Sequence, residues 1–363
     1  MYCHIIVIIL ITPDNFRGGI ICILIGSNIM MLDTFSRPLK DLRISVTDRC
    51  NFRCLYCMPK EVFGPDYVYL ARGEMLTYEE ITRFTRLLVN LGITKVRITG
   101  GEPLLRKDIN HLIEMLALIP ELDLTLTTNG ALLTNEKSVA LKAAGLKRIT
   151  ISLDSLNYDI FASLNDVEFS VDKVINGINN AASAGLNPIK INMVVMRSVN
   201  LSSVVPMAQY FRESGHILRF IEYMDVGDSN GWRLDEVVPS SEIVELIGAQ
   251  LPVEPIAPNY PGEVASRWRY TDGSGEIGLI SSVSQPFCGD CSRLRLSARG
   301  ELFTCLFASS GYDVRSLLRS NASDETIVDA VASLWRSRDD RYSELRSKQS
   351  QQVSRVEMSY IGG

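Results

Sequence analysis

Strand-like and helical segments alternate regularly between residues 42 and 223 of this 363-residue chain. The alternation predicts parallel βα units, because a helix returns the chain to the end where the next parallel strand begins. Thr77 and Glu80 form a capping-box pattern at the start of the first helix. We expect strands at 42–47, 95–99, 122–128, 148–153, 189–196 and 217–223, and helices at 77–91, 107–119, 136–144, 170–184 and 204–214. Six such units fit a partial (β/α)6 TIM-like barrel of the α/β class; a doubly wound sheet is the alternative that the pattern leaves open.

The regions on either side of the alternation differ from it. Residues 1–31 form an apolar extension that we expect to lie outside the fold. Its two apolar runs are far shorter than the roughly 20 residues of a transmembrane helix, so we expect no stable membrane span. The expected divisions of the remaining chain are a barrel at 32–245, a C-terminal α+β region at 246–346, and a tail at 347–363. Within the C-terminal region we expect strands at 266–270 and 276–283, a hairpin through 298–300, and helical sequence at 323–346.

The eight cysteines fall into groups. Cys50, Cys54 and Cys57 follow the first strand at the spacing C-x3-C-x2-C, and Cys288, Cys291 and Cys305 form a second trio at C-x2-C-x13-C. Local clustering in a long chain favours metal binding over disulfides and indicates a reducing compartment, here the cytoplasm. Three thiolates would leave one iron of a four-iron cluster open for a ligand from outside the protein. From spacing alone, zinc completed by a distant ligand and cysteines that only pack both remain open.

Polar residues gather at the ends of successive strands, where barrel enzymes build their active sites. They lie at 99–103 after the second strand, 127–130 after the third, 152–154 after the fourth and 222–224 after the sixth. The formal net charge is −5, which gives no support for nucleic-acid binding. An anionic substrate would therefore need a local basic pocket.

The combined motifs resemble those of the GTP 3′,8-cyclase family of radical S-adenosylmethionine (SAM) enzymes. Enzymes of this family catalyse the first step of molybdenum cofactor biosynthesis. The first trio, with the aromatic residue Tyr56 before its last cysteine, indicates the radical SAM superfamily. The second trio, Arg293-Leu294-Arg295 and the terminal Gly362-Gly363 together indicate the family. The resemblance covers about residues 33–363, and the segments that carry it are 42–59, 96–103, 219–224, 285–295 and the Gly-Gly end.

This resemblance implies a set of site residues. Each trio would bind a [4Fe–4S] cluster, the first trio as Cys50, Cys54 and Cys57 and the second as Cys288, Cys291 and Cys305. SAM contacts are implied for Tyr56, Gly101, Ser152 and Met224. GTP contacts are implied for Arg43, Arg97, Thr128, Lys190, Arg293, Leu294 (through its backbone) and Arg295. Arg219, near the reacting ribose, and Gly362 and Gly363, inserted into the active site, are the implied catalytic residues. Guanidinium groups suit a triphosphate because their paired N–H groups match phosphate oxygens.

The resemblance also implies a reaction. A 5′-deoxyadenosyl radical from SAM takes hydrogen from C3′ of the GTP ribose, and the carbon radical attacks C8 of guanine. Reduction and protonation then give 3′,8-cyclo-7,8-dihydro-GTP. The implied partners are GTP, an electron donor that the sequence does not identify, and cyclic pyranopterin monophosphate synthase, which takes the product. A homodimer is one option for the oligomeric state, which the sequence leaves open.

One segment departs from the family pattern. Residues 163–168 are more acidic and lack a glycine where many relatives have a basic stretch, so we expect altered loop geometry there rather than lost activity. Two other functions stay open. One is a radical SAM enzyme that modifies peptides with an auxiliary cluster, although such enzymes usually have more than three C-terminal cysteines. The other is a zinc-stabilised binding module without catalysis.

Overall fold

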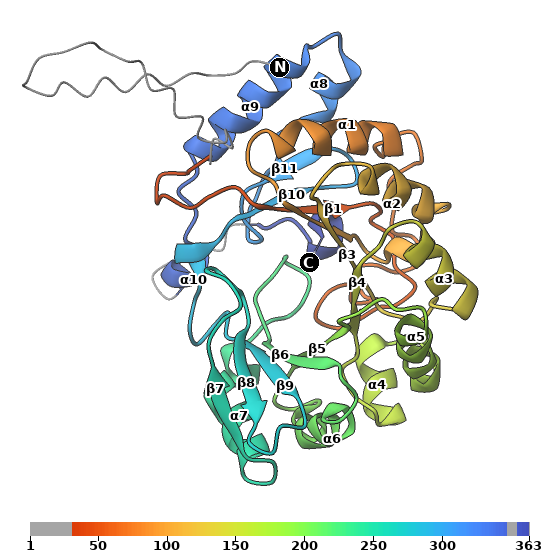
Figure 1. Ribbon diagram of the computed structural model, residues 1–363, viewed down its shortest axis with the longest axis vertical. Coiled ribbons are helices and arrows are strands. Elements are labelled where there is room, and N and C mark those ends of the chain that lie inside the picture. The colour runs from red at the N-terminus through yellow and green to blue at the C-terminus, as the bar shows by residue number, and fades with distance from the viewer. Residues whose placement is uncertain (1–30, 347–353, 363) are drawn as a thin grey trace, which may run out of the picture.

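The computed structural model describes residues 31–346 and 354–362, and over this part of the chain the strands form one twelve-stranded sheet (Figure 1). Its order is β12-β11-β10-β1-β2-β3-β4-β5-β6-β9-β8-β7. The strands are β1 Asp41–Ser45, β2 Lys95–Thr99, β3 Asp123–Thr128, β4 Arg148–Ser152, β5 Lys190–Val195, β6 Ile217–Glu222, β7 Val253–Ile256, β8 Ser266–Tyr270, β9 Glu276–Ile280, β10 Arg293–Leu296, β11 Glu301–Phe303 and β12 Tyr312–Asp313. Strands β1 to β6 are parallel and lie side by side in chain order. A doubly wound sheet reverses its order part-way, so the partial barrel is confirmed and the alternative is wrong.

Helices α1 to α6 cover the outer face of the curved sheet (Figure 1). The α-helices are α1 Tyr78–Val89, α2 Ile109–Ala117, α3 Asn135–Ala143, α4 Tyr158–Asn165, α5 Val171–Ser183, α6 Val204–Phe211, α7 Ser240–Gly248, α8 Arg315–Arg319, α9 Asp324–Arg336, α10 Tyr342–Leu345 and α11 Met358–Ile361; short 3-10 turns are η1 Pro103–Leu105, η2 Leu201–Ser203, η3 Leu234–Glu236 and η4 Cys288–Asp290. The capping box of α1 is confirmed, since Thr77 Oγ1 accepts from Glu80 N and the Glu80 carboxylate accepts from Thr77 N. The sequence pattern missed α4, and the helical run expected at 323–346 is broken between α9 and α10.

Side-chain alternation along the parallel strands separates the core from the interior of the barrel. On β2, Val96 and Ile98 are fully buried in the hydrophobic core, while Arg97 between them lines a cavity inside the curve. Successive strand residues point to opposite faces, so the apolar residues pack under the outer helices and the polar ones face inward. The fold therefore lines its interior with charge.

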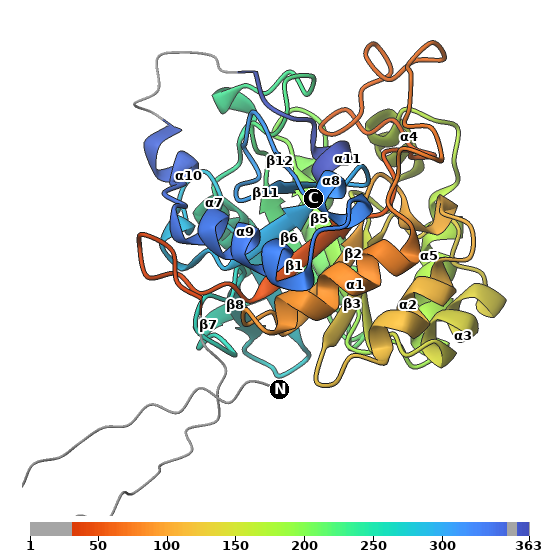
Figure 2. The same cartoon turned by 90° about the horizontal axis from the view of Figure 1, so that it is seen from above.

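The C-terminal region extends the barrel sheet at both edges instead of forming a separate layer. Strand β10 pairs parallel with β1, and β9 pairs parallel with β6, while β11–β12 and β8–β7 continue the sheet antiparallel. Helix α11 lies inside the curve in both views of the ribbon (Figures 1 and 2). At the other terminus, Met31 is buried and its carbonyl accepts from Leu39 N at 2.9 Å. The rest of the expected extension, residues 1–30, lies outside the described residues.

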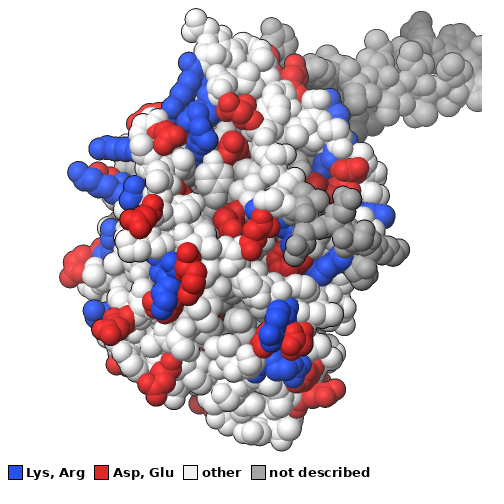
Figure 3. Space-filling view, turned by 180° about the vertical axis from the view of Figure 1, so that it is seen from behind, with Lys and Arg blue, Asp and Glu red and all other residues white. Residues whose placement is uncertain are grey.

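Charges of both signs are interspersed on the face shown in Figure 3, with no broad field of one sign. None of the helices in the described ranges is both long and apolar enough to cross a bilayer.

Candidate active site

A cavity of about 760 Å³ lies inside the curve of the sheet. Residues of both cysteine trios line it, together with inward-facing residues from β1 to β6 and β10. The two cysteine trios, which are more than 200 residues apart in the sequence, thus line one cavity.

The first trio lies on the loop that follows β1, as expected. This loop is fixed from within by Arg53, whose Nη1 donates to Cys50 O at 2.9 Å and to Phe52 O at 2.7 Å. It is fixed from outside by α4, because Asn165 O accepts from Arg53 N at 2.8 Å and Leu164 O accepts from Leu55 N at 3.0 Å.

Residues 163–168, which depart from the family pattern, are therefore part of the support of the first trio. Asp166 ends α4 in the left-handed conformation, with φ of 49°, which a glycine would adopt without steric cost. Its carboxylate pairs with Lys60 Nζ at 2.8 Å, on the segment that follows the cysteines. Residues 163–168 thus include the end of α4 and an ion pair with the segment after the cysteines, and the expectation that activity is retained stays a prediction.

The Gly100-Gly101-Glu102 segment packs against the loop before the trio. A Cβ at Gly101 would lie 2.3 Å from Arg49 O, so only glycine fits there. The fully buried Glu102 carboxylate accepts from Thr128 Oγ1 at 2.7 Å, from Asn129 N at 2.8 Å and from Leu104 N at 2.9 Å. Burial raises the pKa of Glu102 to about 7 despite these hydrogen bonds. Glu102 therefore holds the ends of β2 and β3 together beside Cys50.

Tyr56 links the trio to the end of β4. Its hydroxyl donates to Asp154 Oδ2 at 2.8 Å, and Asp154 Oδ1 accepts from Val194 N at 2.8 Å. Burial raises the pKa of Asp154 to about 6. Ser152 lies at the end of β4 and Met224 just after β6, and both residues line the same cavity.

Three arginines on adjacent strands form what we call the arginine row. The sheet register pairs Arg295 on β10 with Arg43 on β1, and Arg43 with Arg97 on β2. Two positions earlier on these strands, Arg293, Asp41 and Lys95 form a parallel row on the same face. Because all six side chains line the cavity, its wall between the two trios is mainly cationic.

The arginine row is crowded with like charge. Burial and the neighbouring Arg295 and Arg97 hold the pKa of Arg43 well below its usual range. Burial, with Arg293 beside it, lowers the pKa of Arg295 to about 10. The Nε atoms of Arg43 and Arg97 are buried and have no hydrogen-bond partner among the described residues. Buried cations with unpaired donors are costly unless an anion compensates them, so this wall fits a multiply charged anion.

Lys190 and Arg219 add two cations from β5 and β6 to the same cavity. Arg219 is oriented by Asn192, whose Oδ1 accepts from Nε at 3.0 Å and from Nη2 at 2.7 Å. Burial and Arg219 lower the pKa of Lys190 to about 7, and burial and Arg97 lower that of Arg219 to about 9.

The second trio is assembled around η4 and the start and end of the β10–β11 hairpin. Cys288 opens η4, Cys291 follows it, and Cys305 comes after β11. Arg293 Nε donates to Cys291 Sγ at 3.3 Å. Burial would raise the pKa of Cys291, but the charges of Arg293 and Arg338 outweigh it and lower the pKa to about 6. The two arginines therefore favour the thiolate at Cys291, whereas burial raises the pKa of Cys305 to about 11.

The C-terminal tail reaches the arginine row. Gly362 follows α11 with φ of 77°, and its carbonyl accepts a hydrogen bond from Arg295 Nη1. A Cβ at Gly362 would lie 2.5 Å from Thr99 Cγ2. The tail is anchored by Glu357, which accepts from Ser229 Oγ at 2.9 Å, and by the fully buried Ile361. Gly363 lies outside the described residues.

The comparisons with known proteins agree with this geometry. Residues 44–211 match the Radical SAM superfamily, and residues 216–344 match the family described as Molybdenum Cofactor Synthesis C. The chain is 52% identical to GTP 3′,8-cyclase of Acidothermus cellulolyticus, over 91% of this chain and 98% of that protein. It is 48% identical to GTP 3′,8-cyclase of Xanthomonas campestris pv. campestris, over 92% and 97%, and 45% identical to that of Staphylococcus epidermidis, over 91% and 98%. The chain belongs to the GTP 3′,8-cyclase family.

Membership of the GTP 3′,8-cyclase family confirms the resemblance and sets aside the peptide-modifying enzyme and the zinc-binding module. As a radical SAM protein, the chain uses SAM and a [4Fe–4S] cluster. A solved structure of Streptococcus suis SuiB bound to S-adenosylmethionine aligns with 87% of this chain and 69% of its own, at a TM-score of 0.58 and 15% identity. That likeness shows the shared fold.

The donor atoms fit iron–sulfur chemistry. All six trio cysteines are free thiols that face the cavity. Cys50 Sγ accepts from Phe52 N at 3.4 Å, and Cys291 Sγ accepts from Arg293, so sulfur atoms of both trios have N–H donors. Over the described ranges, no three His, Cys, Asp or Glu side chains lie close enough to hold a single metal ion. Thiolates of a cluster bind separate irons and can be more widely spaced.

The structure brings nearly all the residues expected in a GTP 3′,8-cyclase to one cavity. The expected residues in its wall are Arg43, Cys50, Cys54, Tyr56, Cys57, Arg97, Gly101, Thr128, Ser152, Lys190, Arg219, Met224, Cys288, Cys291, Arg293, Arg295 and Cys305. Two expected residues among those described are not in the wall: the Leu294 side chain is fully buried in the core on the other face of β10, and Gly362 lies beside Thr99, where its carbonyl accepts from Arg295. Sequence reasoning missed Asn192, although it lies two residues after Lys190 on β5 and therefore shares the inward face with it.

Proposed function

We propose that the cavity is a two-cluster active site in which the first trio binds the SAM cluster, the second trio binds another [4Fe–4S] cluster, and the cationic wall between them binds GTP. The activity of the chain is that of its family: it converts GTP to 3′,8-cyclo-7,8-dihydro-GTP, the first step of molybdenum cofactor biosynthesis. The observation that carries the proposed site is the arginine row, which lies between the two trios with unpaired, buried donors.

At the first end, Tyr56, Gly101, Ser152 and Met224 would contact SAM. When bound, the cluster and SAM supply the 5′-deoxyadenosyl radical. The chain's own contribution is positional. Tyr56 is fixed by Asp154, and Gly101 brings backbone rather than a side chain to the cavity wall. Such pre-set groups orient a ligand without reorganising at the moment of reaction.

In the middle of the cavity, Arg43, Arg97, Arg293 and Arg295 would bind the triphosphate, with Lys190 beside them. Guanidinium forks bind phosphate oxygens in pairs, and burial strengthens each contact because water does not screen it. Thr128 would help to position the nucleotide; its hydroxyl already donates to Glu102. Leu294 would contribute only backbone, which agrees with its core-facing side chain.

Arg219 and the Gly-Gly end would act nearest the reacting part of GTP. Arg219 is held by Asn192, so its guanidinium has a defined direction. Gly362 occupies a place where a larger residue would collide with Thr99, and Gly363 would continue from it into the cavity. A tail without side chains can offer backbone groups close to a substrate.

Anaerobic reconstitution tests the proposal in two steps. The first is iron and sulfide analysis of the full chain, for which two cubane clusters predict about eight irons per chain. The second is incubation with SAM, dithionite and GTP, for which we expect 5′-deoxyadenosine and the cyclised nucleotide to form together.

Arg43→Gln should weaken GTP binding about tenfold or more, because a charge-assisted hydrogen bond contributes roughly 1.5–3 kcal/mol. Arg83→Gln, at a surface ion pair with Asp324, is the matched control and should bind GTP normally. Normal GTP binding by Arg43→Gln would contradict the assignment of the arginine row.

The remaining partners are proposed on chemical grounds. The reaction needs an external electron donor and an enzyme that takes the product, which in this family's pathway is cyclic pyranopterin monophosphate synthase. Six free cysteines in the described residues favour a reducing compartment, so we propose a cytoplasmic location. A homodimer stays a prediction.

A further inference from the structure

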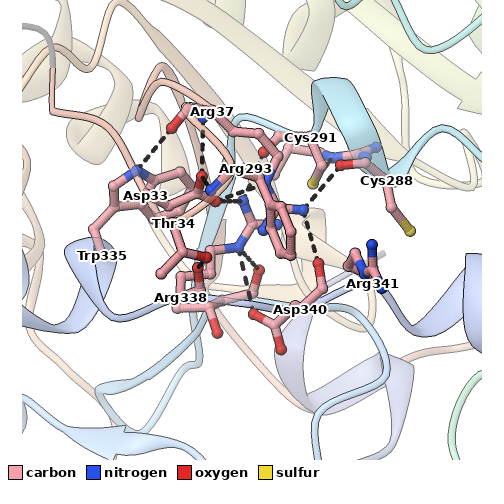
Figure 4. Close-up of polar contacts among 12 residues, drawn as sticks. Asp33, Thr34, Arg37, Cys288, Cys291, Arg293, Trp335, Arg338, Asp340 and Arg341 are labelled. Atoms are coloured by element: carbon pink, nitrogen blue, oxygen red, sulfur yellow. Dashed lines mark hydrogen bonds and ion pairs between the residues drawn. The ribbon is translucent and has the colours of Figure 1, made fainter.

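Two buried arginines beneath the second trio share one carboxylate (Figure 4). Arg37 Nε lies 2.6 Å from Asp33 Oδ2, and Arg338 Nη1 lies 3.0 Å from the same oxygen. The three side chains are at most 2% exposed. Asp33 and Arg37 come from the first described residues of the chain and Arg338 from the segment after α9, about 300 residues away.

The remaining donors of the two arginines are directed at the backbone of the second trio. Arg37 Nη1 donates to Cys288 O at 2.9 Å. Arg338 Nη1 donates to Cys291 O at 2.7 Å, and its Nε donates to Thr304 O, next to Cys305, at 3.1 Å. A guanidinium group therefore binds the backbone carbonyl of Cys288, that of Cys291 and, next to Cys305, that of Thr304.

Neighbouring contacts fix the arginines themselves. Trp335 Nε1 donates to Arg37 O at 3.1 Å, and the Trp335 ring lies 4.6 Å from the Arg338 guanidinium carbon. Asp340 accepts from Arg37 through its carbonyl at 2.7 Å and lies 3.4 Å from Arg338 Nε through its carboxylate. Burying such ionic groups commonly stabilises a fold no more than apolar residues of similar volume would, and often less. A geometric role explains this arrangement better than a contribution to stability.

We propose that Asp33, Arg37 and Arg338 are positioning residues for the second iron–sulfur cluster, which we call the arginine clamp. The inference rests on the proposed function, since it needs a cluster at the second trio. The clamp fixes the spacing of the three cysteines and places positive charge beside them. Arg37 also lines the cavity, and its Nη2 is buried without a hydrogen-bond partner among the described residues. Positive charge and N–H donors near a cluster raise its reduction potential, so the clamp would make the second cluster easier to reduce.

The test compares variants of the anaerobically reconstituted full chain. Arg338→Gln removes the fork and its charge, Arg338→Lys keeps only the charge, and Asp33→Asn removes the shared carboxylate with little change in volume. Arg341→Gln is the control, because it makes the same change in charge three residues away on a side chain that is 44% exposed and donates to no trio carbonyl. The readouts are iron per chain, the rate of iron loss to a chelator, and the potential of the second cluster from a titration followed by electron paramagnetic resonance.

We expect Arg338→Gln to lose the iron of the second cluster at least tenfold faster than the parent. The equilibrium constant for reducing that cluster should fall about tenfold, which lowers its reduction potential by about 59 mV for one electron. Arg338→Lys should restore most of the potential but not the slow iron loss, and Asp33→Asn should speed iron loss. The first cluster and Arg341→Gln should match the parent. Parent-like iron loss and potential in both Arg338→Gln and Asp33→Asn would overturn the clamp. Loss of both clusters together would also overturn it, because a device for the second site leaves the first intact. About four irons in the parent would instead overturn the proposed second cluster.

Discussion

Glu102 and Asp154, buried beside the first trio, are carboxylic acids, whereas the two rows of side chains between the trios hold five arginines and lysines and one carboxylate, Asp41. Burial raises the pKa of Glu102 to about 7 and that of Asp154 to about 6. Between the two trios, burial and neighbouring cations lower the pKa of Lys190 to about 7 and that of Arg295 to about 10. One cavity is therefore polarised along its length. On our proposal, the carboxylic acids lie at the end that binds the cationic SAM, and the arginines and lysines line the middle, which binds the anionic GTP.

The two trios also differ in how the chain holds them. The first is a short loop tied within itself by Arg53 and from outside by α4, more than 100 residues later in the sequence. The second depends on Arg37 and Arg338, which come from opposite ends of the sequence. The thiol pKa values do not divide in the same way: burial raises that of Cys50 to about 12 and that of Cys305 to about 11, while Arg293 and Arg338 lower that of Cys291 to about 6 against the effect of burial. Both trios therefore depend on tertiary contacts, and the second depends on contacts from both ends of the described fold.

Removing one cysteine from each trio should separate the two sites most strongly. Cys50→Ala should abolish SAM cleavage and cyclisation together, because on our proposal the first trio binds the cluster that delivers the electron to SAM. Cys305→Ala should stop cyclisation but leave measurable SAM cleavage. The measurement is 5′-deoxyadenosine and cyclised nucleotide in the same anaerobic reaction. Near-full cyclisation by Cys305→Ala would show that the second trio is not part of the substrate site.

The contrast between the trios explains how far the sequence could predict the structure. The parallel strands, the first trio and the inward arginines follow from local patterns, since alternation on β1, β2 and β10 fixes which side chains share a face. The clamp could not be found this way, because Asp33 and Arg338 meet only through tertiary packing. Helix α4 was missed for a related reason: its last residues serve the cysteine loop, and their sequence was interpreted as a loop that departs from the family.

Substituting Gly362 should impair the arginine-row end while leaving the first trio intact. Gly362→Ala places a Cβ 2.5 Å from Thr99 Cγ2 at a φ of 77°, a strain of about 1–3 kcal/mol. We expect roughly a tenfold or greater loss of cyclisation turnover, with cluster content and GTP binding retained. Gly248→Ala is the control, because no atom lies within 4 Å of its Cβ position. Residues added beyond Gly363 should act like Gly362→Ala, and a C-terminally tagged enzyme with an undiminished rate would contradict this role of the tail.

Changing the pH should weaken GTP binding by a smaller factor. The pKa of Lys190 is lowered to about 7, chiefly by burial, and a bound triphosphate would raise it again. Binding then takes up a proton, so the GTP dissociation constant should rise as pH increases above about 7, by at most tenfold per pH unit. The Lys190→Arg side chain stays charged, so this variant should not show the rise in the GTP dissociation constant that begins near pH 7. Lys95→Arg should keep it, because burial lowers the pKa of Lys95 only to about 8. A flat profile for the unmodified chain between pH 7 and 9 would mean that Lys190 does not meet the triphosphate.

Removing residues 1–29 should have the smallest effect, leaving both trios and the rate of cyclisation unchanged. The deleted sequence has two short apolar runs without a matching pattern later in the chain, and the described fold begins with the buried Met31. The informative control is a deletion that continues through Arg37. It removes Asp33 and Arg37 from the clamp, so the second cluster should be lost while SAM cleavage at the first persists. Iron content and 5′-deoxyadenosine formation measure both outcomes. An inactive 1–29 deletion would show that the extension packs into the fold. Equal iron content in the two deletions would show that the second trio does not need Asp33 and Arg37.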